Sequence, residues 1–198
     1  MKYPDHLCKL IEVLKKLPGV GGKSAERFAF QMLDWAPEHL QEMSDIIKDV
    51  PKNLKQCSEC GCLIGETACA FCNPMRQVNN SMCIVASPRD VFSIEETHEY
   101  HGQYHVLGAL LSPLNGIGVD KLNLHKLRER IAKYHIHEVV IALDSTLEGD
   151  ATALYIKQEL ESMQITVTRL AFGLPMGSAL NYVDGGTLAR AFLGRGRF

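Results

Sequence analysis

The chain has 198 residues, of which 46% are hydrophobic and 22% are charged, and its formal net charge is −2 at pH 7. This balance excludes a protein that wraps nucleic acid with a uniformly basic surface, so any DNA binding must come from local basic patches. The sequence has no run of about 18 apolar residues and no apolar core near its N-terminus, so it predicts neither a membrane span nor a signal peptide.

The first segment, residues 1–53, is predicted to be helical. It opens with apolar residues at helical spacing, namely Leu7, Leu10, Ile11 and Leu14. A glycine-rich turn at residues 18–22 then interrupts the pattern, and a second helix is predicted over Ser24 to Trp35. The segment therefore contains two helices joined by a tight turn.

This turn and the helix after it have the features of a phosphate-binding site. Gly19 and Gly21 let main-chain N–H groups approach a phosphate, and the following helix adds the partial positive charge of its N-terminus. Lys23 and Arg27 are four residues apart and share one helix face. Such contacts give sequence-independent, salt-dependent DNA binding. The alternative is a plain helical hairpin whose glycines only make the turn, but the run L-P-G-V-G-x-K-S-A resembles the helix-hairpin-helix motif.

Four cysteines form a C-x2-C-x8-C-x2-C pattern in the next segment, residues 54–76. Cys57, Cys60, Cys69 and Cys72 can bring four thiolates onto one tetrahedral Zn²⁺. The site is expected to be closed and structural, as in a zinc ribbon, because four thiolates leave no coordination position for water. Four scattered thiols or two disulfides remain alternatives, although disulfides seldom persist in the cytosol, where this chain is expected to reside.

Three further cysteines are expected to be reduced. Cys8 and Cys83 lie in apolar patterns and are predicted to be core residues. Cys62 stands beside the second ligand position and is interpreted as a weak competitor for the metal.

Residues 77–172 alternate short apolar runs with helical stretches. The predicted strands are Met82–Ala86, His105–Leu111, Glu138–Leu143 and Ile165–Ala171. The predicted helices are Asp90–His98, Leu122–Tyr134 and Ala151–Ser162. Strands that alternate with helices predict a mainly parallel α/β sheet domain. Residues 173–198 are predicted to form a short C-terminal helical segment. The basic tail of this segment, with Arg190, Arg195 and Arg197, could be a solvated end, a DNA contact or an oligomer arm, and the sequence does not decide among these roles.

An acidic loop follows the clearest strand. Asp144, Glu148 and Asp150 lie at the carboxyl end of that strand, where open α/β sheets place their ligands, and their oxygens could hold Mg²⁺ weakly. Alternatively, Asp144 and Glu148 cap the next helix or pair with lysines. The loop resembles the metal-binding loop of Toprim domains, found in topoisomerases, primases and related nucleases.

The loop departs from the catalytic Toprim pattern at two positions. Thr146 stands where that pattern has its second aspartate, and Ala86 stands where it has a glutamate at the end of the first strand. That glutamate is the expected acid/base group, so its loss argues against cleavage chemistry. Nothing in the spacing of Asp90 or Glu95 indicates that either replaces it.

Taken in order, the whole chain resembles the bacterial RecR family of recombination mediators. The resemblance covers L-P-G-V-G-G-K-S-A-E-R-F-A-F, the four cysteines, G-Q-Y-H-V-L-G (102–108), L-L-S-P-L (110–114), L-E-G-D-A-T-A (147–153), L-A-F-G-L-P-M-G (170–177) and T-L-A-R-A-F (187–192). It implies four parts: a helix-hairpin-helix DNA-binding region (1–53), a four-cysteine zinc module (54–76), a Toprim-like domain (77–172) and a C-terminal oligomerisation segment (173–198).

The resemblance also implies a function in recombinational DNA repair. Such proteins act with RecO, and in many bacteria with RecF, to load RecA onto single-stranded DNA, and they are not enzymes. They form dimeric or tetrameric rings in which several modest basic patches act together on single- or double-stranded DNA. On this view Lys23 and Arg27 contact DNA, the acidic loop with Glu148 contacts RecO, and the protein is cytoplasmic and associated with the nucleoid.

Two other functions remain open from the sequence. One is a Mg²⁺-dependent Toprim nuclease or strand-transfer enzyme, which would need Asp144, Glu148 and Asp150 as ligands. The other is an interaction scaffold that touches DNA only through its partners.

Overall fold

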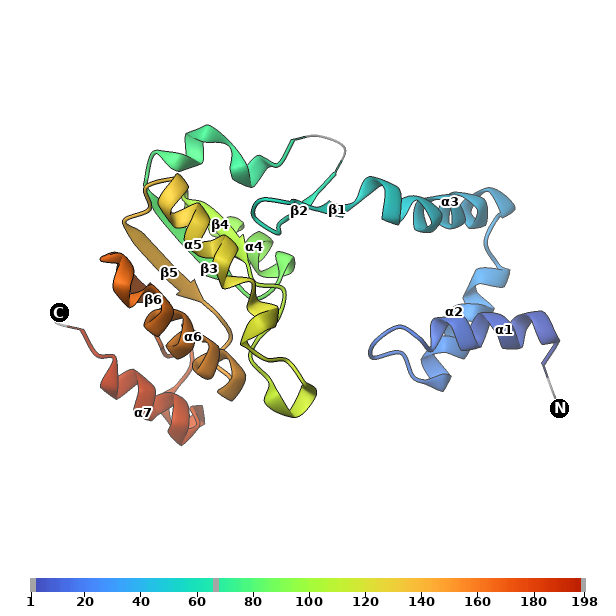
Figure 1. Cartoon of the computed structure of the whole chain (residues 1–198). Coiled ribbons are helices and arrows are strands. Elements are labelled where there is room, and N and C mark those ends of the chain that lie inside the picture. Colours follow the sequence, from blue (N-terminus) through green and yellow to red (C-terminus); the bar gives the residue numbers. More distant parts are fainter. Residues whose placement is uncertain (1–2, 66–67, 197–198) are drawn as a thin grey trace. The chain divides into compact units, whose positions relative to one another are not determined.

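The structure is a computed structural model that describes residues 3–65 and 68–196 (Figure 1). The chain divides into two compact units, Met1–Leu54 and Lys55–Phe198. Arg197 of the predicted basic tail lies outside the described residues. None of the helices in the described part of the chain combines the length and the apolar character that a membrane span requires.

The first unit has three helices within its described residues, 3–54: α1 (Asp5–Leu14), α2 (Gly22–Leu33) and α3 (Pro37–Asn53). Helices α1 and α2 pack against each other, and the small side chains of Ala25 and Ala29 are fully buried between them. The prediction that Cys8 is a core residue is wrong, because its side chain is exposed. Leu7, its neighbour in sequence, occupies the buried stripe instead.

The second unit is built on a parallel sheet of four strands, as the sequence predicted. The strands are β3 (Ser81–Val85), β4 (Gln103–Val106), β5 (Glu138–Ala142) and β6 (Thr166–Arg169), and their order is β4-β3-β5-β6. All three pairings are parallel. The helices of this unit are α4 (Pro88–Glu95), α5 (Leu124–Lys133), α6 (Leu147–Leu160) and α7 (Gly185–Leu193).

The two faces of this sheet have different coverings. Successive residues of a strand point to opposite faces. Met82 and Ile84 of β3 therefore belong to a core cluster with residues of α5 and α6, whereas Cys83 and Val85 belong to a second cluster. This second cluster also holds Val91 of α4 and the buried cysteines of the four-cysteine module, so that module covers one face of the sheet.

The four-cysteine module is attached to the sheet at the end of β4. Its short strands β1 (Lys55–Gln56) and β2 (Leu63–Ile64) pair antiparallel. The N–H of Val106 donates to the carbonyl of Cys60 at 2.8 Å. Gly61 has φ +77°, and a Cβ at this position would lie 2.9 Å from Cβ of Val106. Glycine is therefore required here both for the backbone conformation and for the close approach.

The predicted helices of the second unit start too late in two cases. Helix α4 begins at Pro88 because Ser87 and Asp90 form a capping box. Helix α6 begins at Leu147, since the hydroxyl of Thr146 accepts a hydrogen bond from the N–H of Gly149 at 3.1 Å. Part of the predicted acidic loop is thus the first turn of a helix.

Candidate metal centre and nucleic-acid interface

The four cysteines of the C-x2-C-x8-C-x2-C pattern converge on one point. Their sulfur atoms all lie within 4.8 Å of one another. The Sγ–Sγ distance is 3.8 Å between Cys57 and Cys72 and 3.5 Å between Cys60 and Cys69. Tetrahedral Zn–S bonds of about 2.3 Å would separate the sulfurs by about 3.8 Å, whereas a disulfide needs about 2.05 Å. The geometry therefore fits a tetrathiolate metal site, and the predicted cluster is confirmed.

Neighbouring thiols in this cluster shift one another's pKa. Hydrogen bonds from Cys62 and Cys72 lower the pKa of Cys60. Burial and the negative charge at Cys60 raise the pKa of Cys69 to about 11. A divalent cation would stabilise the remaining thiolates and release their protons. Cys62, predicted as a competing ligand, lies outside the set of four, and its hydrogen bond to Cys60 raises its own pKa.

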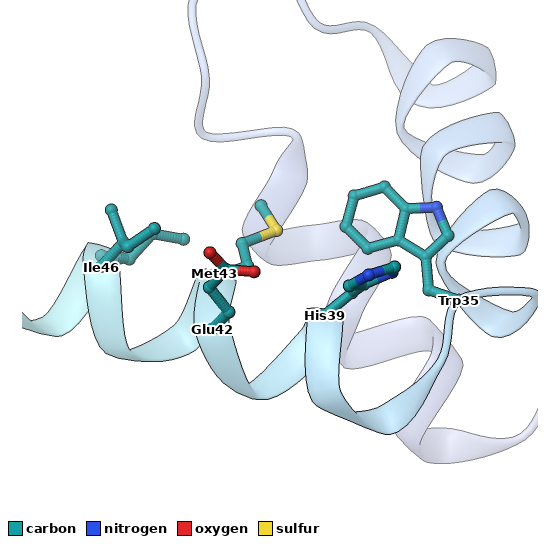
Figure 2. Close-up of a pocket in the computed structure, with 6 residues that line it drawn as sticks. Trp35, His39, Glu42, Met43 and Ile46 are labelled. Atoms are coloured by element: carbon teal, nitrogen blue, oxygen red, sulfur yellow. The ribbon is translucent and has the colours of Figure 1, made fainter.

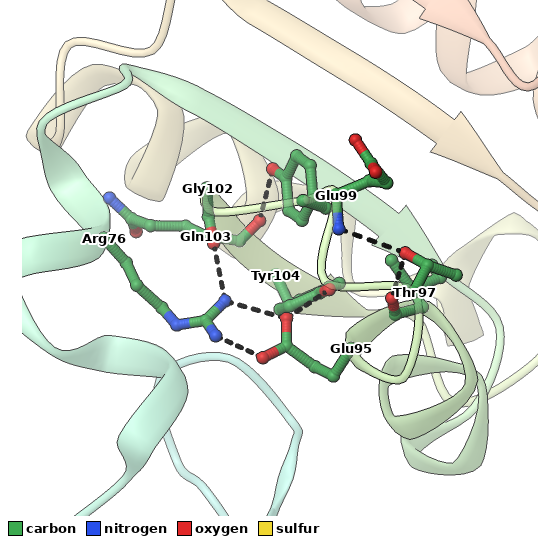
Figure 3. A network of polar contacts seen from close by, with 9 residues as sticks. Arg76, Glu95, Thr97, Glu99, Gly102, Gln103 and Tyr104 are labelled. Atoms are coloured by element: carbon green, nitrogen blue, oxygen red, sulfur yellow. Dashed lines mark hydrogen bonds and ion pairs between the residues drawn. The ribbon is translucent and has the colours of Figure 1, made fainter.

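A polar network fixes the four-cysteine module to the sheet domain (Figure 3). Arg76 forms an ion pair with Glu95 of α4 and donates to the carbonyl of Gly102 at 3.1 Å. The hydroxyl of Tyr104 donates to the same carboxylate at 2.7 Å. The guanidinium of Arg76 also lies 5.3 Å from the ring centroid of Phe71, which is buried in the module. Burying a phenylalanine side chain contributes about 2–3 kcal/mol, so the module and the sheet stabilise each other.

This network decides what Glu95 can do. Burial raises the pKa of Glu95, but hydrogen bonds from Arg76 and Tyr104 outweigh this effect, and the net pKa is lowered. Glu95 is therefore ionised and committed to a structural contact. Asp90 is committed in the same way, because its carboxylate accepts from the N–H of Ser87 at 2.7 Å. Neither acid replaces the glutamate that is missing at Ala86.

The three acids of the predicted magnesium site do not gather at one point. Asp144 follows β5 and is exposed, and Glu148 is exposed in the first turn of α6. Asp150 is half-buried, and its two oxygens accept hydrogen bonds from Arg169 and Arg190, each at 2.6 Å. These two arginines lower the pKa of Asp150. Among the described residues, only the four cysteines form a group with metal-ligand spacing.

The two arginines also attach the C-terminal helix to the carboxyl edge of the sheet. Arg190 of α7 donates to the hydroxyl of Ser145 at 2.8 Å in addition to its contact with Asp150. The ring of Phe172 lies near both guanidinium groups, with centroid distances of 4.6 Å to Arg169 and 4.7 Å to Arg190. The sequence does not predict this cluster, because its members are far apart along the chain and no local pattern links them.

The glycine-rich turn presents the start of α2 to solvent. Gly19 has φ +78°, a left-handed conformation that favours glycine, whereas Gly21 is extended and forms the N-cap of α2 without a side-chain cap. The first N–H groups of α2 therefore have no capping side chain. Lys23 and Arg27 are both exposed, on the side of α2 away from buried Ala25. The turn thus combines open backbone donors with two basic side chains.

Comparison with known proteins places this geometry in a family. The chain matches the RecR helix-hairpin-helix family model over residues 7–50, the Toprim domain model over residues 80–171 and the RecR C-terminal model over residues 173–195. It is similar to Recombination protein RecR of Protochlamydia amoebophila, with 61% identity over 198 residues and 100% of both chains covered. It is also similar to Recombination protein RecR of Chlamydia abortus (48% identity, 98% of each chain) and of Chlamydia trachomatis serovar D (47% identity, 100% of each chain).

Proposed function

The chain belongs to the RecR family of recombination proteins, and we propose that it is a sequence-independent DNA-binding mediator of recombinational repair. In this role it helps to load the RecA recombinase onto single-stranded DNA. The observation that carries the proposal is the uncapped N-terminus of α2 beside exposed Lys23 and Arg27. Backbone donors and basic side chains of this kind contact phosphates and carry no base information. The protein would therefore bind both single- and double-stranded DNA.

Gly21 supports a DNA contact in particular. Its extended backbone does not require glycine, and a Cβ at this position would meet no atom within 4 Å. The fold therefore tolerates a side chain here. A side chain at this position would instead obstruct the approach of another molecule to the open N–H groups of α2. A glycine is therefore expected here if a DNA backbone binds to these groups.

The variant Gly21→Ser separates folding from binding. Serine is a favourable N-cap residue, and its hydroxyl would accept a hydrogen bond from the second or third N–H of α2. The variant should be as stable as the wild type or more stable, yet bind DNA more weakly, because those donors are occupied and the approach is obstructed. Thermal unfolding and fluorescence anisotropy with a labelled oligonucleotide measure the two effects. Unchanged DNA affinity in a folded Gly21→Ser variant would contradict the proposal.

We assign Zn²⁺ to the four-cysteine site in a structural role. The site would be closed, because four thiolates complete a tetrahedral shell. Cys57 and Cys60 are buried in the core cluster that covers one face of the sheet. The metal would therefore hold together the module that completes this core.

An apolar surface on the first unit supports the proposal that the protein assembles into a homodimer or homotetramer ring. Helix α3 has no buried residue, although it carries several large apolar side chains. Trp35, Met43 and Ile46 line a surface hollow of about 340 Å³ along α3, with His39 and Glu42 beside them (Figure 2). Large exposed apolar surfaces commonly mark interaction sites, and a second copy of the chain would cover this one. Several hairpins in one ring would then act on the same DNA.

The exposed acids at the carboxyl edge of the sheet support a partner contact. Asp144 and Glu148 offer negative charge next to the Asp150 cluster, which consists of Asp150, Arg169 and Arg190. We assign this surface to RecO, with RecF as a further partner in organisms that have it. This function places the protein in the cytoplasm at the nucleoid.

A Mg²⁺-dependent nuclease or strand-transfer activity has less support. Ala86 cannot act as a general acid or base, and Thr146 is used as the N-cap of α6. Both oxygens of Asp150 already accept hydrogen bonds from arginines. The protein is therefore proposed to bind DNA without cutting or joining it.

A further inference from the structure

Arg130 is a buried charge without an acidic partner. It lies on α5 with 2% of its surface exposed, and the ion pairs found among the described residues do not include it. Its guanidinium donates to neutral acceptors, namely the carbonyl of Tyr104 at 2.7 Å, Nδ1 of His105 at 3.1 Å and Oε1 of Gln103 at 3.3 Å. Its Nε has no hydrogen-bond partner. Since buried charges are normally paired, a source of negative charge is expected nearby.

His105 links Arg130 to the surroundings of the four-cysteine site, because it bonds Arg130 and lines the same cavity as two of the cysteines. Because Nδ1 accepts a hydrogen bond from Arg130, the ring proton lies on Nε2. His105 lines a cavity of about 320 Å³ together with Cys57, Cys60 and Lys126. Burial and the charges of Arg130 and Lys126 lower the pKa of His105 to about 3, whereas the charge at Cys60 acts in the opposite direction. Positive and negative charges thus act on His105 from different neighbours.

We propose that Arg130, acting through His105, and Lys126 stabilise the zinc–thiolate site by balancing its negative charge. This inference rests on the zinc assignment made above. Four thiolates around one Zn²⁺ carry two net negative charges, and the two basic side chains supply two positive ones. Nearby positive charge favours the thiolate form, which is the form that binds metal. Arg130, His105 and Lys126 are therefore positioning residues of the metal site.

A purely structural role of Arg130 predicts a different pattern of effects. Its hydrogen bond to Tyr104 also supports β4, so any loss of Arg130 could destabilise the sheet whether or not metal is bound. Charge balance predicts in addition that zinc affinity follows the charge at this position. Arg130→Lys keeps the charge but loses the planar donor group, whereas Arg130→Gln keeps polar donors but loses the charge.

The test is a competition for Zn²⁺ between the full-length protein and a chromogenic chelator. Arg130→Gln should lower zinc affinity by about 10- to 100-fold, as removal of outer-shell partners commonly does. Arg130→Lys should stay within a few-fold of the wild type. Arg128→Gln is the matched control, because Arg128 lies on the same helix, is exposed and pairs with Glu159. It should leave zinc affinity unchanged.

Lys126→Gln keeps the inference testable if Arg130→Gln does not fold. Lys126 is only half-buried, so its loss should not disturb folding. Its removal should weaken zinc binding by a few-fold, with a smaller difference at high salt, where exposed charges are screened. Wild-type zinc affinity in both Arg130→Gln and Lys126→Gln would overturn the inference, as would an equal loss in Arg130→Lys and Arg130→Gln. A wild-type protein that binds no zinc would instead overturn the zinc assignment and this inference with it.

Discussion

Replacing the two basic residues of the hairpin should remove two phosphate contacts per subunit. Lys23 and Arg27 are exposed and four residues apart on α2, which corresponds to a rise of about 6 Å along the helix. Both can therefore reach the same stretch of one DNA strand. The variant Lys23→Ala/Arg27→Ala should stay folded, because the core residues between α1 and α2, such as Ala25, are untouched.

The magnitude follows from counterion release. Each phosphate contact contributes about 0.9 to the slope of log K against log salt for duplex DNA and about 0.7 for single strands. Loss of two contacts should lower the slope by about 1.8 for duplex DNA and about 1.4 for single-stranded DNA, for each subunit engaged. Between 50 and 200 mM salt, the wild type should thus lose about 12-fold more duplex affinity than the variant does.

The assay is a salt titration of DNA affinity by fluorescence anisotropy. Lys48→Ala/Lys52→Ala is the matched control, since it removes the same charge at the same spacing from exposed positions of α3. This control should leave the slope unchanged. An unaltered affinity and slope in the folded Lys23→Ala/Arg27→Ala variant would refute the assignment of the hairpin as the DNA contact. An equal change in both variants would mean that overall charge, and not the hairpin, sets the binding.

Three further predictions concern the second unit. Cys57→Ala/Cys60→Ala should lose the metal, lower the melting temperature and disturb assembly, because ligation energy is folding energy; a metal-free variant that is fully folded and oligomeric in thermal denaturation and light scattering would contradict this. The pKa of Glu95 in the folded protein lies below its ordinary value of 4.5. The pair of Glu95 with Arg76 therefore contributes fully to folding stability above pH 4.5, and this contribution is lost as the pH falls through the lower pKa of the folded state. Urea unfolding across this range should therefore show a weaker pH dependence for Glu95→Gln, and equal curves would speak against the network. Arg190→Ala should speed amide hydrogen exchange in α7 and leave the exchange of the sheet unchanged, since Arg190 attaches this helix to the Asp150 cluster; unchanged exchange in α7 would show that other contacts hold it.

The sequence predicts best those features that short patterns encode. The spacing of the four cysteines predicted their convergence, because two C-x2-C pairs with a short spacer can bring four thiolates onto one tetrahedral metal ion. The apolar runs around Ile84 and Ile141 predicted the parallel sheet. Local signals for the start of α4 were also present, since Ser87, Pro88 and Asp90 form a recognisable N-terminal pattern, yet the predicted helix began two residues late.

Features that depend on distant residues were not predictable in the same way. The contact of Asp150 with Arg169 and Arg190 joins three parts of the chain that only the folded sheet brings together. Arg130 is harder still, because a basic residue on an amphipathic helix is ordinarily exposed. Its burial follows from the packing of α5 against the sheet, where the carbonyl of Tyr104 accepts its hydrogen bond.

We propose that this protein binds DNA through the hairpin and leaves the covalent structure of the DNA intact. The most direct test is one experiment on end-labelled gapped DNA, with and without Mg²⁺, in which complexes and products are resolved together. We predict that the DNA is retarded but intact at low salt, and that it is released at higher salt. Shortened or rejoined strands that appear only with Mg²⁺ would contradict this proposal and show that the acidic residues act catalytically despite Ala86.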